Sequence, residues 1–167
     1  MNNILNDEGV LEMYYIIQYC LLFIFLTFCG FISFYEGSDI FIYSESWKES
    51  AFFTQLLGKE ITTPSDISQL DLFIYSLKYK PIFPICFIVL LIYLITLTIF
   101  LIFRRNRKKL NGSLILIGVF FIITAFFIGK PYSLGIKILL GILISCGILY
   151  LSSPFLLKRI KSRLSLN

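Results

Sequence analysis

The chain has 167 residues, of which 57% are hydrophobic and 15% are charged, and its formal net charge is +5. Soluble domains carry about 25% charged residues, and a chain this short cannot bury so much apolar surface in a core of its own. The composition therefore excludes an ordinary soluble domain and indicates that lipid solvates much of the chain. The absence of His excludes His-ligated haem or zinc and nucleophiles that His would activate.

The first apolar stretch covers residues 13–35 and follows an acidic N-terminal segment, 1–12. A helix needs about 20 apolar residues to cross a bilayer, because the hydrocarbon core is about 30 Å thick. A cleaved signal peptide would carry Lys or Arg before its apolar region and a small-residue cleavage site after it. This stretch has neither feature, so we expect a retained transmembrane helix over 13–35.

A half-polar segment over residues 36–80 follows, far longer than a simple connection between neighbouring helices. The sequence SWKE at 46–49 has the pattern of a capping box, in which the Ser and Glu side chains bond the free N–H groups of a helix start. Gly58 suits a left-handed helix end. These signals predict a short amphipathic helix over 47–57.

A second amphipathic helix is predicted over 64–79. Thr63 is a suitable N-cap, Pro64 suits the first helical position and Asp66 places an acid in the first turn. Pro81 ends the helix. The apolar and aromatic side chains of the two helices form the candidate interaction surface: Trp47, Phe52, Phe53, Ile67, Leu70, Phe73, Ile74 and Leu77. Two interpretations stay open, a docking surface for a partner or lipid, and a lid that shelters helix ends.

Three further uncharged stretches predict transmembrane helices over 81–103, 110–129 and 138–157. They are joined by a basic loop at 104–109 and a short turn at 130–137, and a basic tail follows at 158–167. Close helix contacts are expected at small residues, namely Gly118 and Ala125 on the third span and Gly141 and Ser145 on the fourth. The expected fold class is an all-α integral membrane protein with four transmembrane helices and a long extracytoplasmic loop between the first two.

The distribution of charge predicts the orientation. All ten acidic residues precede residue 72, and nine of the fifteen Lys and Arg residues fall on the side that holds both termini and the 104–109 loop. Because cytoplasmic loops collect Lys and Arg, we expect both termini in the cytoplasm and the 36–80 loop on the other side of the membrane. The topology anchors are Arg104, Arg105, Arg107, Lys108, Lys109, Lys158, Arg159, Lys161 and Arg163.

No motif in the sequence carries catalytic chemistry. The four Cys lie inside predicted spans and form no C-x-x-C pair. We expect them to serve as small apolar side chains without a redox role. No charged residue lies near the centre of a span, where ion-coupled transporters usually keep one. Four acidic residues of the loop could form a weak cation site, but their spacing matches no calcium motif: Glu36, Asp39, Asp66 and Asp71. We therefore expect no catalytic residue, metal, cofactor or small-molecule substrate, and no enzyme.

The basic run RRNRKK at 104–109 has two interpretations. It could bind nucleic acid or anionic lipid, or it could serve only to hold a short loop in the cytoplasm. The second is favoured because a turn between two helices needs nothing more, and no nucleic-acid partner is expected.

Two strings frame the loop: SFYEGSDI follows the first span, and SDISQLDLFIYSLKYKPIFPI leads into the second. They resemble the YjdJ-like family of small membrane proteins from Bacillus-type bacteria, a domain of unknown function (DUF4306). The resemblance covers about residues 13–103 and rests on Tyr35, Glu36, Gly37, Ser38, Asp66, Ile67, Ser68, Gln69, Leu70, Asp71, Lys80, Pro81 and Pro84. It implies a membrane protein and implies no activity, and residues 104–167 lie beyond it.

The expected function is non-enzymatic. The protein would bind or regulate another component of the cell envelope through the outer loop, with the lipid bilayer, another membrane or envelope protein, or a second copy of the chain as partner. The alternative is a small transporter, channel or immunity-type membrane protein.

Overall fold

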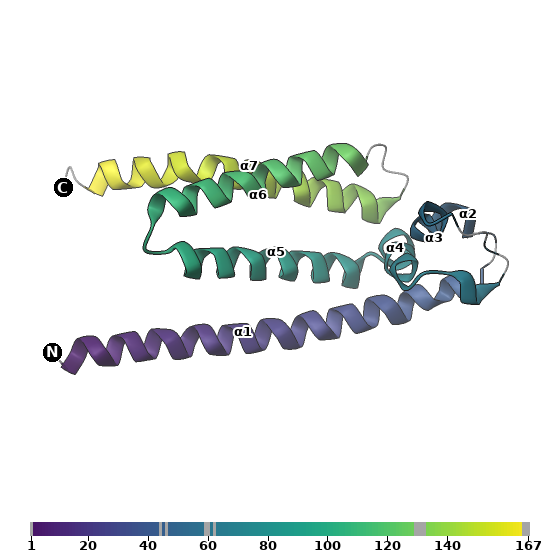
Figure 1. Cartoon of the computed structure of the whole chain (residues 1–167), viewed down its shortest axis with the longest axis horizontal. Helices are drawn as coiled ribbons and strands as arrows, with labels where there is room; N and C mark the ends of the chain where they lie inside the picture. The colour runs from purple at the N-terminus through teal and green to yellow at the C-terminus, as the bar shows by residue number, and fades with distance from the viewer. Residues whose placement is uncertain are drawn as a thin grey trace. The chain divides into compact units, whose positions relative to one another are not determined.

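The computed structural model describes residues 2–43, 45, 47–58, 61, 63–128 and 133–164, with the backbone alone for 2–12, 48–49 and 155–164. Within these ranges every regular element is a helix (Figure 1). Among the described residues, four helices are long enough and apolar enough to cross a bilayer, through the segments Met13–Phe41, Ile82–Phe103, Arg107–Ile128 and Leu134–Pro154. The predicted all-α class with four candidate spans is confirmed at this level.

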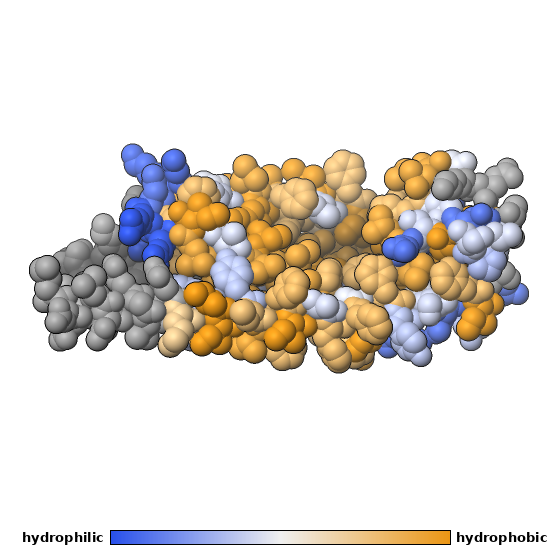
Figure 2. Space-filling view, turned by 60° about the horizontal axis from the view of Figure 1, so that its bottom comes forward, coloured by the Kyte–Doolittle hydropathy of each residue, from blue (hydrophilic) through white to orange (hydrophobic). Residues whose placement is uncertain are grey.

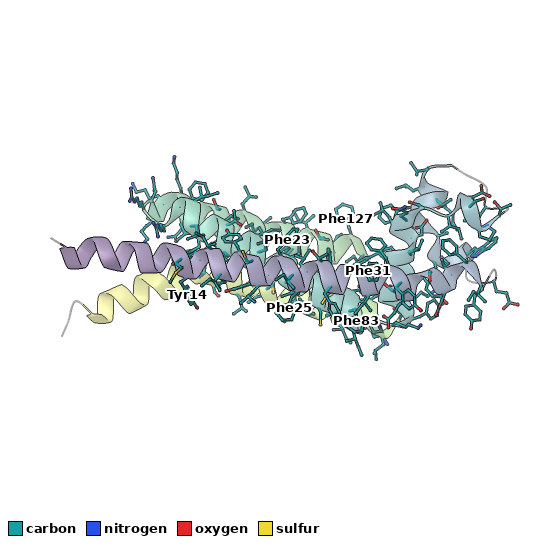
Figure 3. The ribbon with its side chains drawn as sticks, turned by 90° about the horizontal axis from the view of Figure 1, so that it is seen from below. Tyr14, Phe23, Phe25, Phe31, Phe83 and Phe127 are labelled. Carbon is teal, nitrogen blue, oxygen red and sulfur yellow. The ribbon has the colours of Figure 1, made fainter. Side chains whose placement is uncertain are left out.

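The chain divides into two compact units, Met1–Leu94 and Ile95–Asn167, and each is described by itself. In the first unit, α1 runs over Asn2–Gly37 and passes directly into the 3₁₀ helix η1, Ser38–Phe41. The helix is longer than the predicted span at both ends, because no Pro interrupts the chain and backbone hydrogen bonding continues past the acidic residues. Figure 3 shows aromatic side chains standing out from α1, which are exposed along its apolar segment: Tyr14, Phe23, Phe25 and Phe31.

Short helices fill the segment between α1 and the second span: α2 over Trp47–Ser50, α3 over Phe52–Leu56, η3 over Pro64–Asp66 and α4 over Gln69–Tyr79. The predicted helix over 47–57 is thus divided at Ala51, whose backbone leaves the helical region. The predicted helix over 64–79 is divided at Ile67 and Ser68, which are extended. Ser68 breaks the helix because its hydroxyl accepts a hydrogen bond from the Leu70 N–H, starting α4 afresh.

The local helix signals have mixed outcomes. Gly58 has φ +69°, so the predicted left-handed end after the first short helix is confirmed. The carboxylate of Asp66 accepts the backbone N–H of Thr63 at 2.8 Å, so the predicted second cap is also present, although it starts the three-residue η3. Ser46, the N-cap predicted for the first helix, lies outside the described residues.

The remaining helices are α5, Ile82–Phe103, α6, Arg107–Ile128, and α7, Leu134–Leu164. The predicted basic loop over 104–109 is shorter in the structure, because α6 already begins at Arg107. Helix α7 continues through Pro154, which cannot donate to the carbonyl of Tyr150. The hydroxyl of Ser153 donates to that carbonyl at 2.8 Å, so the backbone group stays satisfied.

In the second unit, α6 and α7 pack at two glycines. A Cβ added at Gly118 would lie 3.0 Å from the carbonyl oxygen of Gly147, and one added at Gly147 would lie 3.2 Å from that of Gly118. Gly118 and Ala125 are buried, as predicted for close contact. The prediction for the fourth span was wrong, since Gly141 faces open space and Ser145 is exposed. The contact lies instead on the face of Gly147.

Candidate functional site

The loop subdomain, residues 38–80, is the part of the first unit that lies between the ends of α1 and α5. It packs closely against α1, because a Cβ added at Gly37 would lie only 2.1 Å from the carbonyl oxygen of Leu72 in α4. Only a residue without a side chain permits this approach. The end of α1 and the middle of α4 are therefore held backbone against backbone.

A buried carboxylate ties α3 to α4. Asp71 is fully buried, and its oxygens accept hydrogen bonds from the backbone N–H of Phe53 at 2.7 Å and of Thr54 at 2.9 Å. These N–H groups belong to the first turn of α3 and have no partner within that helix. The Thr54 hydroxyl donates to Asp71 at 2.6 Å and accepts from the Ser68 N–H at 2.8 Å. Asp71 thus acts as an N-terminal cap for a helix that lies elsewhere in the sequence.

A small apolar core lies beside this network. Ile40, Ile67 and Tyr75 are buried together, with Trp47, Ile61 and Leu72 packed around them. The indole N–H of Trp47 donates to the carbonyl of Ile40 at 2.7 Å, so the large ring is fixed by a polar contact as well as by packing.

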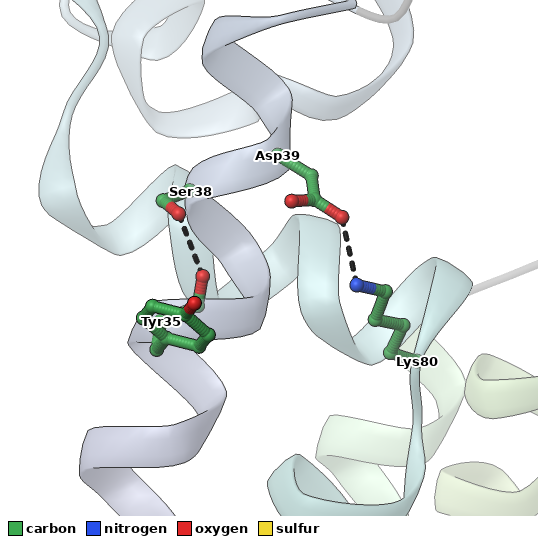
Figure 4. A network of polar contacts seen from close by, with 4 residues as sticks. All are labelled: Tyr35, Ser38, Asp39 and Lys80. Carbon is green, nitrogen blue, oxygen red and sulfur yellow. Dashed lines mark hydrogen bonds and ion pairs between the residues drawn. The ribbon is translucent and has the colours of Figure 1, made fainter.

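An ion pair closes the subdomain where it meets the second span. Lys80 Nζ lies 2.7 Å from Asp39 Oδ2, and the Ser38 hydroxyl donates to the carbonyl of Tyr35 at 2.7 Å (Figure 4). The hydrogen bond to Asp39 raises the pKa of Lys80 above its ordinary value. Burial, reinforced by the Asp39 charge, raises the pKa of Tyr75. Both groups therefore keep their protons more firmly in the folded chain.

The residues of the predicted interaction surface fall into three groups. Ile67 and Leu77 are buried, so they are core residues and not the surface residues we expected. Only Phe52 and Leu70 are exposed. The remaining four are half-buried: Trp47, Phe53, Phe73 and Ile74. A helical periodicity identifies which side chains are apolar, but it does not show which of them face a neighbouring helix.

Sequence reasoning missed several exposed apolar residues of the subdomain, and three of them are more than two-thirds exposed. Ile42 follows η1 and is exposed, and Leu56 and Leu57 at the end of α3 are exposed as well. The exposure of Leu56 and Leu57 could have been predicted from their position directly before Gly58, because the side chains at the end of a short helix have few neighbours in the same helix. Figure 2 shows hydrophobic residues over the long helices and a mixture of hydrophobic and hydrophilic residues at the end that carries the subdomain.

Three of the four acidic residues of the predicted cation site lie in separate contacts. Asp39 pairs with Lys80, Asp66 caps Thr63 and Asp71 caps α3. In the part of the chain that the structure describes, no group of three or more Cys, Asp or Glu side chains could hold a metal ion.

The basic anchors lie in two places, in the 104–109 segment after α5 and in the last part of α7. Five of them are exposed: Arg104, Arg105, Arg107, Lys108 and Lys109. The side chains of Lys158, Arg159, Lys161 and Arg163 lie outside the described residues, although the backbone there is helical.

In the described residues every element is helical, and four apolar helices of spanning length, with a small polar subdomain between the first two, are typical of multi-pass membrane proteins by length and composition. The chain belongs to the family described as a domain of unknown function, DUF4306, whose model matches residues 16–103. It is 28% identical over 88 residues to the uncharacterized protein YjdJ of Bacillus subtilis (strain 168), covering 50% of this chain and 81% of the relative. No solved structure matches the chain.

The family match begins within α1 and ends with α5. It takes in α1 from Ile16, the whole loop subdomain and α5, and it ends at Phe103, the last residue of α5. The predicted resemblance is therefore confirmed, and α6 and α7 lie outside the matched region. The residues that carried the resemblance have structural roles here, in close packing at Gly37, in capping at Ser68 and Asp71, and in the ion pair of Lys80.

Proposed function

We propose that this chain is a non-enzymatic integral membrane protein of the bacterial cell membrane that binds another envelope protein through its loop subdomain. The observation that carries the proposal is the combination of a fixed framework with exposed apolar side chains. The buried Asp71 and the close contact at Gly37 favour one arrangement of the short helices. Ile42 and Leu70 are exposed on that framework, and exposed apolar side chains of this kind are available for contact with a partner.

Photo-crosslinking tests this proposal. A photoreactive phenylalanine analogue is placed at Ile42 or Leu70 in the full chain in cells, with Ser65, an exposed polar position on η3, as the matched control. A discrete protein adduct from Ile42 or Leu70, absent at Ser65, is expected. Trp47 and Phe73 are poor positions for the probe because both pack within the first unit. Adducts with lipid alone, or equal adducts from all three positions, would contradict a docking role.

The proposed orientation places both termini and the 104–106 turn in the cytoplasm and the loop subdomain outside. It is supported by the exposed basic residues at the start of α6, since such residues favour the cytoplasmic side. A membrane-impermeant maleimide applied to intact cells should label a Ser65→Cys variant and should label an Asn106→Cys variant only after lysis. The reverse pattern would invert the topology.

A further inference from the structure

The end of α3 carries an apolar surface that no part of the described chain covers. Phe52, Leu56 and Leu57, hereafter the α3 edge, are 58%, 70% and 69% exposed. Phe52 and Leu56 are four residues apart, so they lie on one face of the helix, and Leu57 follows at its end. Three neighbouring large apolar side chains in water would be costly, so the identity of their neighbour is informative.

The depth of the subdomain can be inferred from α4. The ring of Phe73 lies 6.2 Å from that of Phe34 in α1 and 5.6 Å from that of Phe87 in α5. Phe34 and Phe87 both belong to the apolar segments Met13–Phe41 and Ile82–Phe103. Helix α4 therefore lies at the boundary of the two spans and does not project away from them.

Helix α3 shares this depth because it is fixed to α4. Asp71, two residues before Phe73, accepts the N–H groups at the start of α3. Figure 1 shows α2 and α3 near the end of α1, on the side where α4 lies. In a bilayer spanned by α1 and α5, α3 would therefore lie near the level of the interface.

We propose that the α3 edge inserts into the interfacial region of the lipid bilayer and rests the loop subdomain on the membrane surface. A short helix with an apolar edge suits this environment, because its apolar side chains enter the acyl boundary while its polar groups stay hydrated. Gln55, next to Leu56, is a polar residue of this helix, and its side-chain amide donates to the backbone carbonyl of Trp47 at 3.3 Å. The inference rests on the proposed membrane insertion and is independent of the proposed envelope partner.

The test uses the full chain in lipid nanodiscs, with its four Cys replaced by Ala and one new Cys labelled with an environment-sensitive nitrobenzoxadiazole dye. The test positions are Leu56 and Leu57. The matched controls are Gln55 on the same helix and Ser65 on η3, both exposed. Phe25, which is exposed on the apolar segment of α1, reports insertion of the span. The quencher is a phospholipid that carries a nitroxide near the glycerol backbone.

The labels at Leu56 and Leu57 should show blue-shifted emission and be quenched by the nitroxide lipid more strongly than the labels at Gln55 and Ser65, as expected for shallow insertion. The labels at Gln55 and Ser65 should stay in water and be quenched by iodide. Equal quenching at Leu57 and Ser65 would overturn the proposal. So would a label at Leu57 that is shielded from both quenchers, since a second copy or a protein partner would then cover the α3 edge. If the nitroxide lipid does not quench the label at Phe25, the membrane insertion of α1 itself is overturned. The Phe25 control thus distinguishes failure of the proposed insertion from failure of the inference about the α3 edge.

Discussion

Thr54 donates two hydrogen bonds to one oxygen of Asp71, from its backbone N–H at 2.9 Å and from its hydroxyl at 2.6 Å. Hydrogen bonds to a charged group contribute about 1.5–3 kcal/mol each, more than those between neutral groups. A carboxylate fully removed from water is tolerated only when it is well paired. This pair therefore holds α3 against α4.

The Asp71→Ala variant should release α3 from α4. It leaves the N–H groups of Phe53 and Thr54 without a partner, so we expect a local destabilisation of about 3 kcal/mol. That corresponds to about 100-fold less protection of those amides in hydrogen exchange measured in nanodiscs. The matched control is Asp66→Ala, which removes the cap of the three-residue η3 and should cost only about 1 kcal/mol. Equal loss of protection in the two variants would contradict a special role for Asp71.

The Gly37→Ala variant tests the contact between α1 and α4. The added methyl group would lie 2.1 Å from the Leu72 carbonyl oxygen and 2.6 Å from the carbonyl carbon, so backbone must move. Overpacking of this kind costs about 1–3 kcal/mol, and protection of α4 amides should fall accordingly. Gly112→Ala is the control, because a Cβ there meets nothing within 4 Å and Ala favours a helix by about 1 kcal/mol. An unchanged α4 in Gly37→Ala would show that the helices are not in contact.

The spans were predictable because hydrophobic length is a property of consecutive residues. Their ends were not, since a helix does not stop where lipid stops: α1 continues through Glu36, and α6 begins at Arg107 inside the predicted loop. Local caps were also readable, as Gly58 and Asp66 show. Each depends on residues within a few positions of one another.

The role of Asp71 could not be predicted from its position in the sequence. On a helical wheel it is one more polar residue of an amphipathic helix, but its partners lie 17 and 18 residues earlier. The same limitation affects Leu77, which the wheel assigns to an apolar face and the structure buries. Hydrophobic periodicity identifies the apolar face of a helix, but only tertiary packing decides whether that face contacts lipid, solvent or another helix.

The contact between α6 and α7 depends on Gly118 and Gly147, because the two helices approach each other closely at these residues. In Gly118→Val, the first atom of the new side chain already lies 3.0 Å from the Gly147 carbonyl oxygen and 3.1 Å from the Tyr150 Cβ. We expect a loss of about 1–3 kcal/mol in the unfolding free energy of the hairpin, measured by steric trapping in a bilayer. Gly141→Val is the control, because no atom lies within 4 Å of its added Cβ. If both variants unfold alike, small residues do not set the contact between these helices.

Alkaline pH should open the loop subdomain before it affects the spans. The hydrogen bond to Asp39 raises the pKa of Lys80, and burial raises the pKa of Tyr75. Because the folded chain holds both protons more tightly than the unfolded chain, the stabilisation is complete below about pH 10, near the unfolded pKa values. It is lost as pH rises through the higher folded pKa values.

The emission of Trp47, the single Trp of the chain, reports this transition because its ring packs on the core that contains Tyr75. We expect a red shift that begins above about pH 10. In Tyr75→Phe the shift should be less steep, since one of the two titrating groups is gone, and in Lys80→Met the part due to the ion pair should disappear. High salt at neutral pH should weaken only the exposed Lys80–Asp39 pair and leave the Trp47 emission nearly unchanged. An emission maximum that stays constant through the alkaline range in the unmodified chain would contradict the coupling of these two protons to the fold.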